Sequence, residues 1–201
     1  MNVLDNPFAT RYVRPGAQAF LFSGEDSLEQ LVNRLRQNHG WGQIIGPHGA
    51  GKSTLLASLI PALREAGRHV ILVTLREAQR RLPRQVLDEL RHSPNALLIV
   101  DGYEQLSRSN RYLLRRRCRR ARGGLLVTAH HSVDLPDLYH VVPSLEIVQR
   151  LVARITPGRD TVVTAADVEA CFSLRGHDVR ETLFDLYNLH LRRSRQTPSD
   201  R

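Results

Sequence analysis

Apolar residues along the first 143 positions follow two alternating patterns. Short, nearly continuous apolar runs are typical of strands that helices cover on both faces. They span residues 43–45, 69–75, 96–101 and 125–130, with a plausible further run at 139–142. Between the runs, apolar residues recur at helical spacing, which predicts one helix that ends before Gly40 and others over 53–66, 83–91 and 106–122. This order predicts an α/β three-layer sandwich around a mostly parallel sheet.

The pattern after residue 143 is only helical. Apolar residues at helical spacing predict three helices over residues 144–192, and residues 193–201 are predicted to be a disordered tail. We therefore expect a core over residues 1–143, which includes an irregular N-terminal arm, and a small helical lid over 144–192.

A glycine-rich segment joins the first predicted strand to the helix that follows it. It matches the phosphate-loop pattern GxxxxGK(S/T), in which backbone N–H groups surround nucleotide phosphates at the N-terminus of a helix. Its residues are Gly46, Pro47, His48, Gly49, Ala50, Gly51, Lys52, Ser53 and Thr54. Lys52 is the only lysine of the chain, and it falls where the loop needs a compact ammonium for the β- and γ-phosphates. The segment predicts a P-loop nucleoside triphosphatase.

The apolar run at residues 97–100 ends in Asp101, as in the Walker B pattern. We expect Asp101 to lie beside the phosphate loop, with one strand between the two motif-bearing strands of the sheet. Its carboxylate and the Ser53 hydroxyl are the predicted protein groups for Mg²⁺, and ATP is the predicted nucleotide.

Hydrolysis also needs a group that orients the attacking water. Many ATPases carry Glu directly after the Walker B Asp, but that position here is Gly102, and the first acid is Glu104. Glu104 is the preferred candidate if the chain bends at Gly102, and Glu77 is the alternative. Either Thr128 or His130, at the end of the next predicted strand, is expected near the γ-phosphate.

Arginines dominate the predicted helix over residues 106–122. The formal net charge is +9, with 29 Lys+Arg against 20 Asp+Glu. Arg108, Arg111, Arg115 and Arg119 share one helix face, which suggests a nucleic-acid contact surface or an arginine supplied to a neighbouring subunit. A solvated helix face is the plainer alternative, and a compositionally biased genome also explains part of the arginine excess.

The apolar stretches and the cysteines of the chain bear on its expected location and on metal binding. Neither a membrane-spanning stretch nor a signal-peptide core is recognisable, so a cytoplasmic protein is expected. Cys118 and Cys171 have no metal-ligand spacing and are expected to be reduced.

The order of these parts resembles the AAA+ class of P-loop ATPases. Residues 176–181, Gly-His-Asp-Val-Arg-Glu, look like the sensor-2 segment of bacterial replication initiators. The resemblance implies that Arg180 reaches the γ-phosphate and that nucleotide state is coupled to a partner, either a protein or a further copy of the chain. Gly102 departs from the class and is closer to slow nucleotide switches, and no arginine finger can be assigned, although Arg117 and Arg120 are candidates.

Two readings of the function follow. The first is a Mg²⁺-dependent ATPase, and the alternative is a slow or non-hydrolysing nucleotide-gated binding module. A small-molecule kinase is disfavoured because the expected strand between the two motifs and a water-orienting acid are features of hydrolases. GTP is disfavoured because the chain has no second lysine for an Asn-Lys-x-Asp element.

Overall fold

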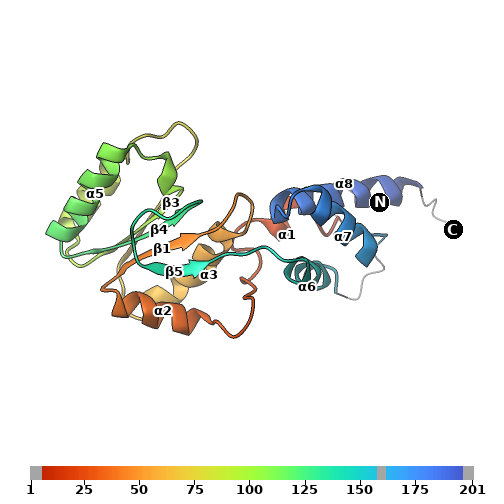
Figure 1. The fold of residues 1–201 in the computed structure, drawn as a ribbon, viewed down its shortest axis with the longest axis horizontal. Coiled ribbons are helices and arrows are strands. Elements are labelled where there is room, and N and C mark those ends of the chain that lie inside the picture. Colours follow the sequence, from red (N-terminus) through yellow and green to blue (C-terminus); the bar gives the residue numbers. More distant parts are fainter. Residues whose placement is uncertain (1–5, 158–161, 197–201) are drawn as a thin grey trace.

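The computed structural model describes residues 6–157 and 162–196 of the 201-residue chain. Its centre is a sheet of five parallel strands in the order β2-β3-β4-β1-β5 (Figure 1). The strands are β1 (Trp41–Ile45), β2 (Val70–Thr74), β3 (Leu97–Asp101), β4 (Gly124–Ala129) and β5 (Asp137–His140). β4 lies between β1 and β3, which confirms the predicted strand between the phosphate loop and Asp101.

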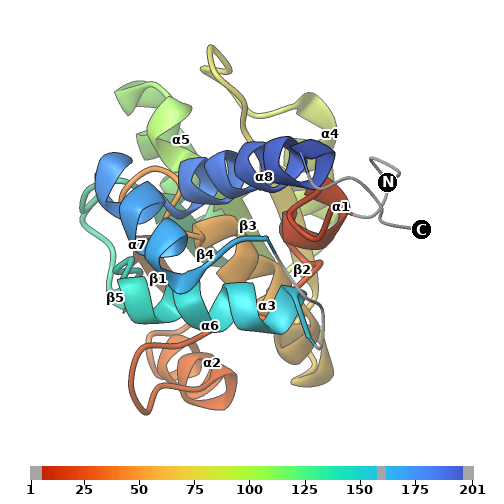
Figure 2. The same cartoon turned by 90° about the vertical axis from the view of Figure 1, so that its right-hand side faces the viewer.

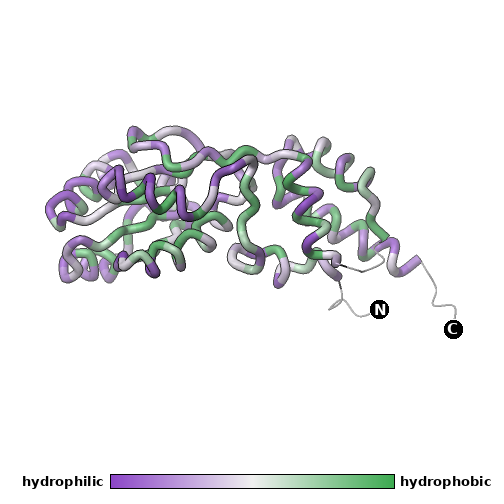
Figure 3. Tube along the Cα trace, turned by 90° about the horizontal axis from the view of Figure 1, so that it is seen from below, coloured by the Kyte–Doolittle hydropathy of each residue, from purple (hydrophilic) through white to green (hydrophobic). Residues whose placement is uncertain are grey.

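Helices cover both faces of the sheet. Along β3, Leu97 and Ile99 pack with α2 (Leu28–Gln37) and α3 (Lys52–Glu65), whereas Leu98 and Val100 pack with α4 (Arg84–His92) and α5 (Arg108–Arg120). This alternation follows from the two-residue period of a strand. The helices themselves alternate between hydrophobic and hydrophilic residues along their length (Figure 3). The predicted α/β three-layer fold is confirmed.

The last three helices form a second group beside the sheet, which we call the C-terminal helices (Figures 1 and 2). They are α6 (Leu145–Ile155), α7 (Ala165–Leu174) and α8 (Val179–Gln196). Their side chains share a separate hydrophobic cluster that includes Val148, Phe172 and Leu186. This group occupies the segment predicted to be a lid.

The predicted disordered tail over residues 193–201 is wrong at its start. α8 continues to Gln196 because Arg193 is anchored against the beginning of α7. Its Nη1 and Nη2 donate to the Asp167 carboxylate at 2.5 and 2.9 Å, and Nη1 also donates to the Val162 carbonyl oxygen at 2.7 Å. Residues 197–201 lie outside the described residues.

The N-terminal arm connects both groups of helices, which corrects its assignment to the core alone. Phe8, next to the short helix α1 (Thr10–Val13), packs in the cluster of the C-terminal helices, and Asn6 Nδ2 donates to the Tyr187 carbonyl oxygen of α8. Further along, Phe20 N donates to Ser58 Oγ of α3 at 2.9 Å. The arm therefore spans the junction between the sheet and the C-terminal helices.

The predicted helix over residues 106–122 is confirmed as the single helix α5, which is two residues shorter at each end. A short 3-10 helix, η2 (Tyr103–Gln105), follows Asp101 and Gly102, and α5 begins only after Ser107, whose hydroxyl accepts a hydrogen bond from Asn110 N. No helix among the described residues combines the length and the apolar composition that a membrane span requires.

Candidate functional site

One cavity of about 790 Å³ is bordered by nearly all of the predicted site residues. It lies where the carboxyl ends of the strands meet the N-terminal arm and α8, and its volume is within the usual range for small-molecule sites. The predicted residues on its wall are His48, Gly49, Ala50, Gly51, Lys52, Ser53, Thr54, Asp101, Glu104, Thr128 and Arg180. The two predicted residues that do not border this cavity, Gly46 and Pro47, line a smaller neighbouring cavity.

The Lys52 side chain forms hydrogen bonds with the backbone of the phosphate loop. Its Nζ donates to the carbonyl oxygens of Gly46 at 2.7 Å and Pro47 at 2.8 Å. Burial lowers the pKa of Lys52, and the carboxylates of Glu104, Asp101 and Asp178 oppose that shift. The ammonium therefore lies among three acids at the mouth of the loop.

A hydrogen-bonded network joins the ends of three elements at the predicted Mg²⁺ position. Ser53 Oγ, on the first turn of α3, donates to Asp101 Oδ2 at 2.8 Å. Thr128 Oγ1, on β4, donates to Asp101 Oδ1 at 2.6 Å and accepts from Gly102 N at 2.8 Å. The Thr128 hydroxyl is thus fully engaged, and its contacts indicate that it orients Asp101. The Ser53 and Asp101 oxygens are the hard donors that suit Mg²⁺.

Gly102 provides the bend that Glu104 requires. Its φ is +84°, in the left-handed region that favours glycine, and a Cβ there would lie 3.0 Å from the Leu75 carbonyl oxygen. The chain turns into η2, and Glu104 comes to the wall of the cavity. Glu104 Oε1 lies 3.5 Å from His130 Nε2, while Oε2 is buried and has no hydrogen-bond partner in the part of the chain that the structure describes. The alternative acid, Glu77, also borders the cavity but is exposed.

His130 lies between the glutamate and the phosphate loop. Burial and the Lys52 charge lower its pKa, and the Glu104 carboxylate opposes them. The rings of His130 and His48 are 6.0 Å apart. Of the two residues predicted near the γ-phosphate, His130 contacts Glu104 and Thr128 contacts Asp101.

The start of α8 rests directly on the phosphate loop through Asp178, a residue that was not predicted to belong to the site. Asp178 Oδ1 accepts from Glu181 N at 3.0 Å, and Asp178 Oδ2 lies 3.3 Å from His48 Nδ1. A Cβ built on Gly49 would overlap the Asp178 carboxylate, so the two residues are in close contact. Its sequence signal is its place before the first turn of a predicted helix, where Asp is a favoured cap.

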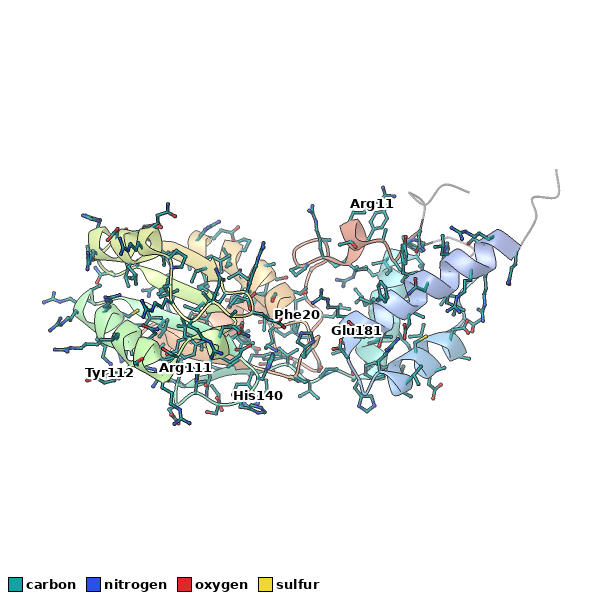
Figure 4. All side chains as sticks on the ribbon, turned by 90° about the horizontal axis from the view of Figure 1, so that it is seen from above. Arg11, Phe20, Arg111, Tyr112, His140 and Glu181 are labelled. Carbon is teal, nitrogen blue, oxygen red and sulfur yellow. The ribbon has the colours of Figure 1, made fainter. Side chains whose placement is uncertain are left out.

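The rest of the cavity wall is largely apolar. Phe20 and Leu21 of the arm, Ile147 and Leu151 of α6 and Phe184 of α8 border it, together with Arg180. Figure 4 shows Phe20 at the junction between the sheet and the C-terminal helices. This wall can bury a flat apolar group such as a base, and the phosphate loop can bind anionic groups.

The predicted arginine face of α5 is partly turned toward the core, which corrects its interpretation. Arg111 donates to the carbonyl oxygens of Glu104 at 2.7 Å and Leu106 at 2.9 Å. Arg115 donates to Tyr103 Oη at 3.2 Å and to the Val133 carbonyl oxygen, and the Arg119 guanidinium lies 5.5 Å from the centre of the Trp41 ring. Of the four predicted residues, only Arg108 is exposed without a polar or aromatic partner in the described chain. Backbone carbonyls and aromatic rings near α5 therefore bind most of this face.

Comparison with solved structures supports the fold. NtrX from Brucella abortus in complex with ATP aligns with a TM-score of 0.56 and 14% identity, over 92% of this chain and 55% of NtrX. NtrX in complex with ADP aligns with a TM-score of 0.57 and 15% identity, over 98% of this chain and 56% of NtrX. The chain therefore spans about half the length of these structures. No protein-family model matches the sequence, and no curated protein is detectably similar. The chain therefore shares the α/β fold of the aligned part of NtrX.

Proposed function

We propose that this chain binds ATP with Mg²⁺, hydrolyses it, and couples the nucleotide state to the position of its C-terminal helices. The observation that carries the proposal is the network of Ser53, Asp101 and Thr128 beside the Lys52 ammonium. ATP and ADP are bound by the structural neighbour NtrX, which supports nucleotide binding by this chain.

The phosphate groups would be held by the N-terminus of α3 and by Lys52. To reach them, Lys52 would exchange its contacts with the Gly46 and Pro47 carbonyl oxygens for phosphate oxygens. Ser53 and Asp101 would hold Mg²⁺, which when bound neutralises phosphate charge. Because Thr128 already orients Asp101, the carboxylate needs little rearrangement to serve as a ligand.

Glu104 would orient the attacking water. The water oxygen forms a bond to the γ-phosphorus, the bond from that phosphorus to the bridging oxygen breaks, and ADP leaves with the electron pair. Glu104 Oε2 would accept the water proton, because it is buried and has no hydrogen-bond partner among the described residues. Arg180, on α8 at the wall of the cavity, would stabilise charge on the γ-phosphate.

A slow nucleotide switch is the second candidate. It is favoured by the contact between Glu104 and His130 and by the Asp178 carboxylate on the phosphate loop, since both arrangements must change before hydrolysis. In such a protein the bound nucleotide would set the position of α8 without rapid turnover.

Steady-state phosphate release from ATP and Mg²⁺ tests the proposal. We expect Lys52→Ala to lose both ATP binding and turnover, and Glu104→Gln to keep binding but lose turnover by about 10²-fold or more. Glu77→Gln is the matched control and should retain turnover. Binding without turnover in the wild type would establish the switch, whereas equal loss in Glu77→Gln would move the water-orienting role away from Glu104.

Adenine specificity, an oligomeric state and a cytoplasmic location remain predictions of the same proposal. Arg117 and Arg120 are exposed on α5 and stay candidates for an arginine supplied to a neighbouring copy. ATP hydrolysis that rises faster than linearly with protein concentration would support that role.

A further inference from the structure

The outer side of α5 and the loop beside it form a surface with an excess of positive charge. Seven of the 13 residues of α5 are arginine and none is acidic. The loop over residues 76–81 is exposed throughout and contributes further arginines. We define the basic face as the exposed residues Arg80, Arg81, Arg108, Tyr112, Arg116 and Arg120.

The basic face is one continuous surface because the loop is fastened to the start of α5. The Arg80 carbonyl oxygen accepts from Asn110 Nδ2 at 2.8 Å and from Ser107 N at 3.4 Å. These bonds place Arg80 and Arg81 beside Arg108. From Arg108 the face continues along α5 at every fourth residue, so its side chains follow one line about 6 Å apart along the helix.

Glu77 is the one acid in the loop over residues 76–81, and no ion pair joins an acid to the arginines of the basic face among the described residues. In the described chain the arginines that form ion pairs lie elsewhere, and the acids of the adjacent α4 are already engaged, Asp88 with Arg91 and Glu89 with His69. Like charges four residues apart repel one another on a helix, so Arg116 and Arg120 destabilise α5 until an anion binds. A regularly spaced polyanion fits this arrangement better than isolated anions.

Tyr112 indicates which polyanion fits. Its side chain is 67% exposed, lies between Arg108 and Arg116, and is at the outer edge of the molecule, whereas Arg111 lies nearer the core (Figure 4). An exposed aromatic ring within a row of arginines is the combination that binds single-stranded nucleic acid, because bases stack on the ring and phosphates contact the guanidinium groups. An acidic polypeptide would use the charges but not the ring.

We propose that the basic face binds the sugar-phosphate backbone of single-stranded nucleic acid, with one base stacked on Tyr112. The binding surface stands independently of the proposed ATPase, and only its coupling to nucleotide rests on that function. The structural link between the basic face and the proposed nucleotide site is short. Arg111 of α5 donates to the Glu104 carbonyl oxygen. The loop over residues 76–81 begins directly after Leu75, whose carbonyl oxygen lies beside Gly102.

The test is fluorescence anisotropy of the full chain with labelled oligo-dT and oligo-rU of about 20 nucleotides, without ATP, over about 50–200 mM salt. Five phosphate contacts predict a slope of log K against log salt of about −3.5. We expect Arg80→Glu/Arg81→Glu and Arg108→Glu/Arg116→Glu each to weaken binding at least tenfold. Tyr112→Ala should weaken binding about fivefold or more without changing the slope.

Arg36→Glu/Arg64→Glu is the matched control, because it makes the same charge change on α2 and α3, across the sheet. Loss of binding in this variant equal to that in the other two would reduce the effect to net charge and overturn the proposal. Unchanged binding in both test pairs, or binding of poly-glutamate with none of either oligonucleotide, would also overturn it. ATP binding by the same variants is measured separately, so failure of the nucleotide site is recognised independently.

Discussion

The contact between Asp178 and the phosphate loop predicts that the chain restrains its own nucleotide binding. Asp178 places a carboxylate against Gly49, whose N–H is among those expected to bind phosphate, and the carboxylate is held there by His48 and by its cap on α8. Its side chain is 18% exposed, so water screens it only in part. A bound triphosphate would therefore be repelled unless α8 moves. The substitution Asp178→Asn removes the charge and keeps the shape.

The expected magnitude follows from the charges. Two unit charges about 4 Å apart repel by about 1 kcal/mol in water and about 4 kcal/mol at the effective dielectric of a protein surface. For a partly exposed carboxylate we expect about 1–2 kcal/mol, so Asp178→Asn should tighten ATP binding about 5- to 30-fold. The gain should be smaller for ADP, which lacks the γ-phosphate charge. Asn caps helices as well as Asp does, so stability should change little.

Isothermal titration of ATP and ADP into the wild type, Asp178→Asn and Asp178→Ala measures the effect. Asp178→Ala should tighten ATP binding in the same way but lower the free energy of unfolding by about 1 kcal/mol, because it also removes the cap. ATP binding by Asp178→Asn that equals or is weaker than that of the wild type would refute the reasoning. Such a result would mean that the carboxylate does not compete with phosphate.

Three further outcomes are expected. Gly102→Ala should lower the free energy of unfolding by about 1–3 kcal/mol in urea titrations, because its φ of +84° is strained for alanine, and should reduce phosphate release. Thr128→Val should cost about 1–2 kcal/mol by leaving Asp101 with one fewer hydrogen bond, and should impair turnover more than ATP binding. Arg193 lowers the pKa of Asp167 from 3.8 to about 2, so the stabilisation by this pair is complete above pH 3.8 and is lost toward pH 2. Arg193→Ala should therefore show a weaker loss of stability over that range in acid titrations.

Much of the fold was predictable because strong local patterns coincide with it. The apolar runs that end in Asp101 and in residues 125–130 became β3 and β4, since continuous apolar strands need cover on both faces. The succession of β1, phosphate loop and α3 was also predictable, because the loop motif is local in sequence. Lys52, Asp101 and Glu104, which the motifs predicted to lie together, border one cavity.

The rest depended on contacts between distant segments. Helical spacing placed Arg111 and Arg115 on a common face, but it did not reveal that carbonyl oxygens after β3 and β4 would turn them inward. Asp178 reads as an ordinary helix cap until its contact with His48, 130 residues away, is known. Arg193 likewise belongs to the helix only because Asp167 on α7 binds it. Long-range electrostatic partners leave no periodic signal in a single sequence.

The contacts of its arginines give α5 two opposed roles that a simple amphipathic helix lacks. Toward the core, Arg111 binds the Glu104 carbonyl oxygen and lies 5.4 Å from the centre of the buried Tyr103 ring, so the helix supports the turn that presents the proposed catalytic acid. Toward solvent, Arg108 and Arg116 flank Tyr112, and neither arginine forms an ion pair with a described residue. A ligand on the outer side that shifts α5 along its axis would move the inner contact as well, because one rigid helix carries both. Coupling between a bound strand and the acid therefore needs no segment beyond α5 and η2.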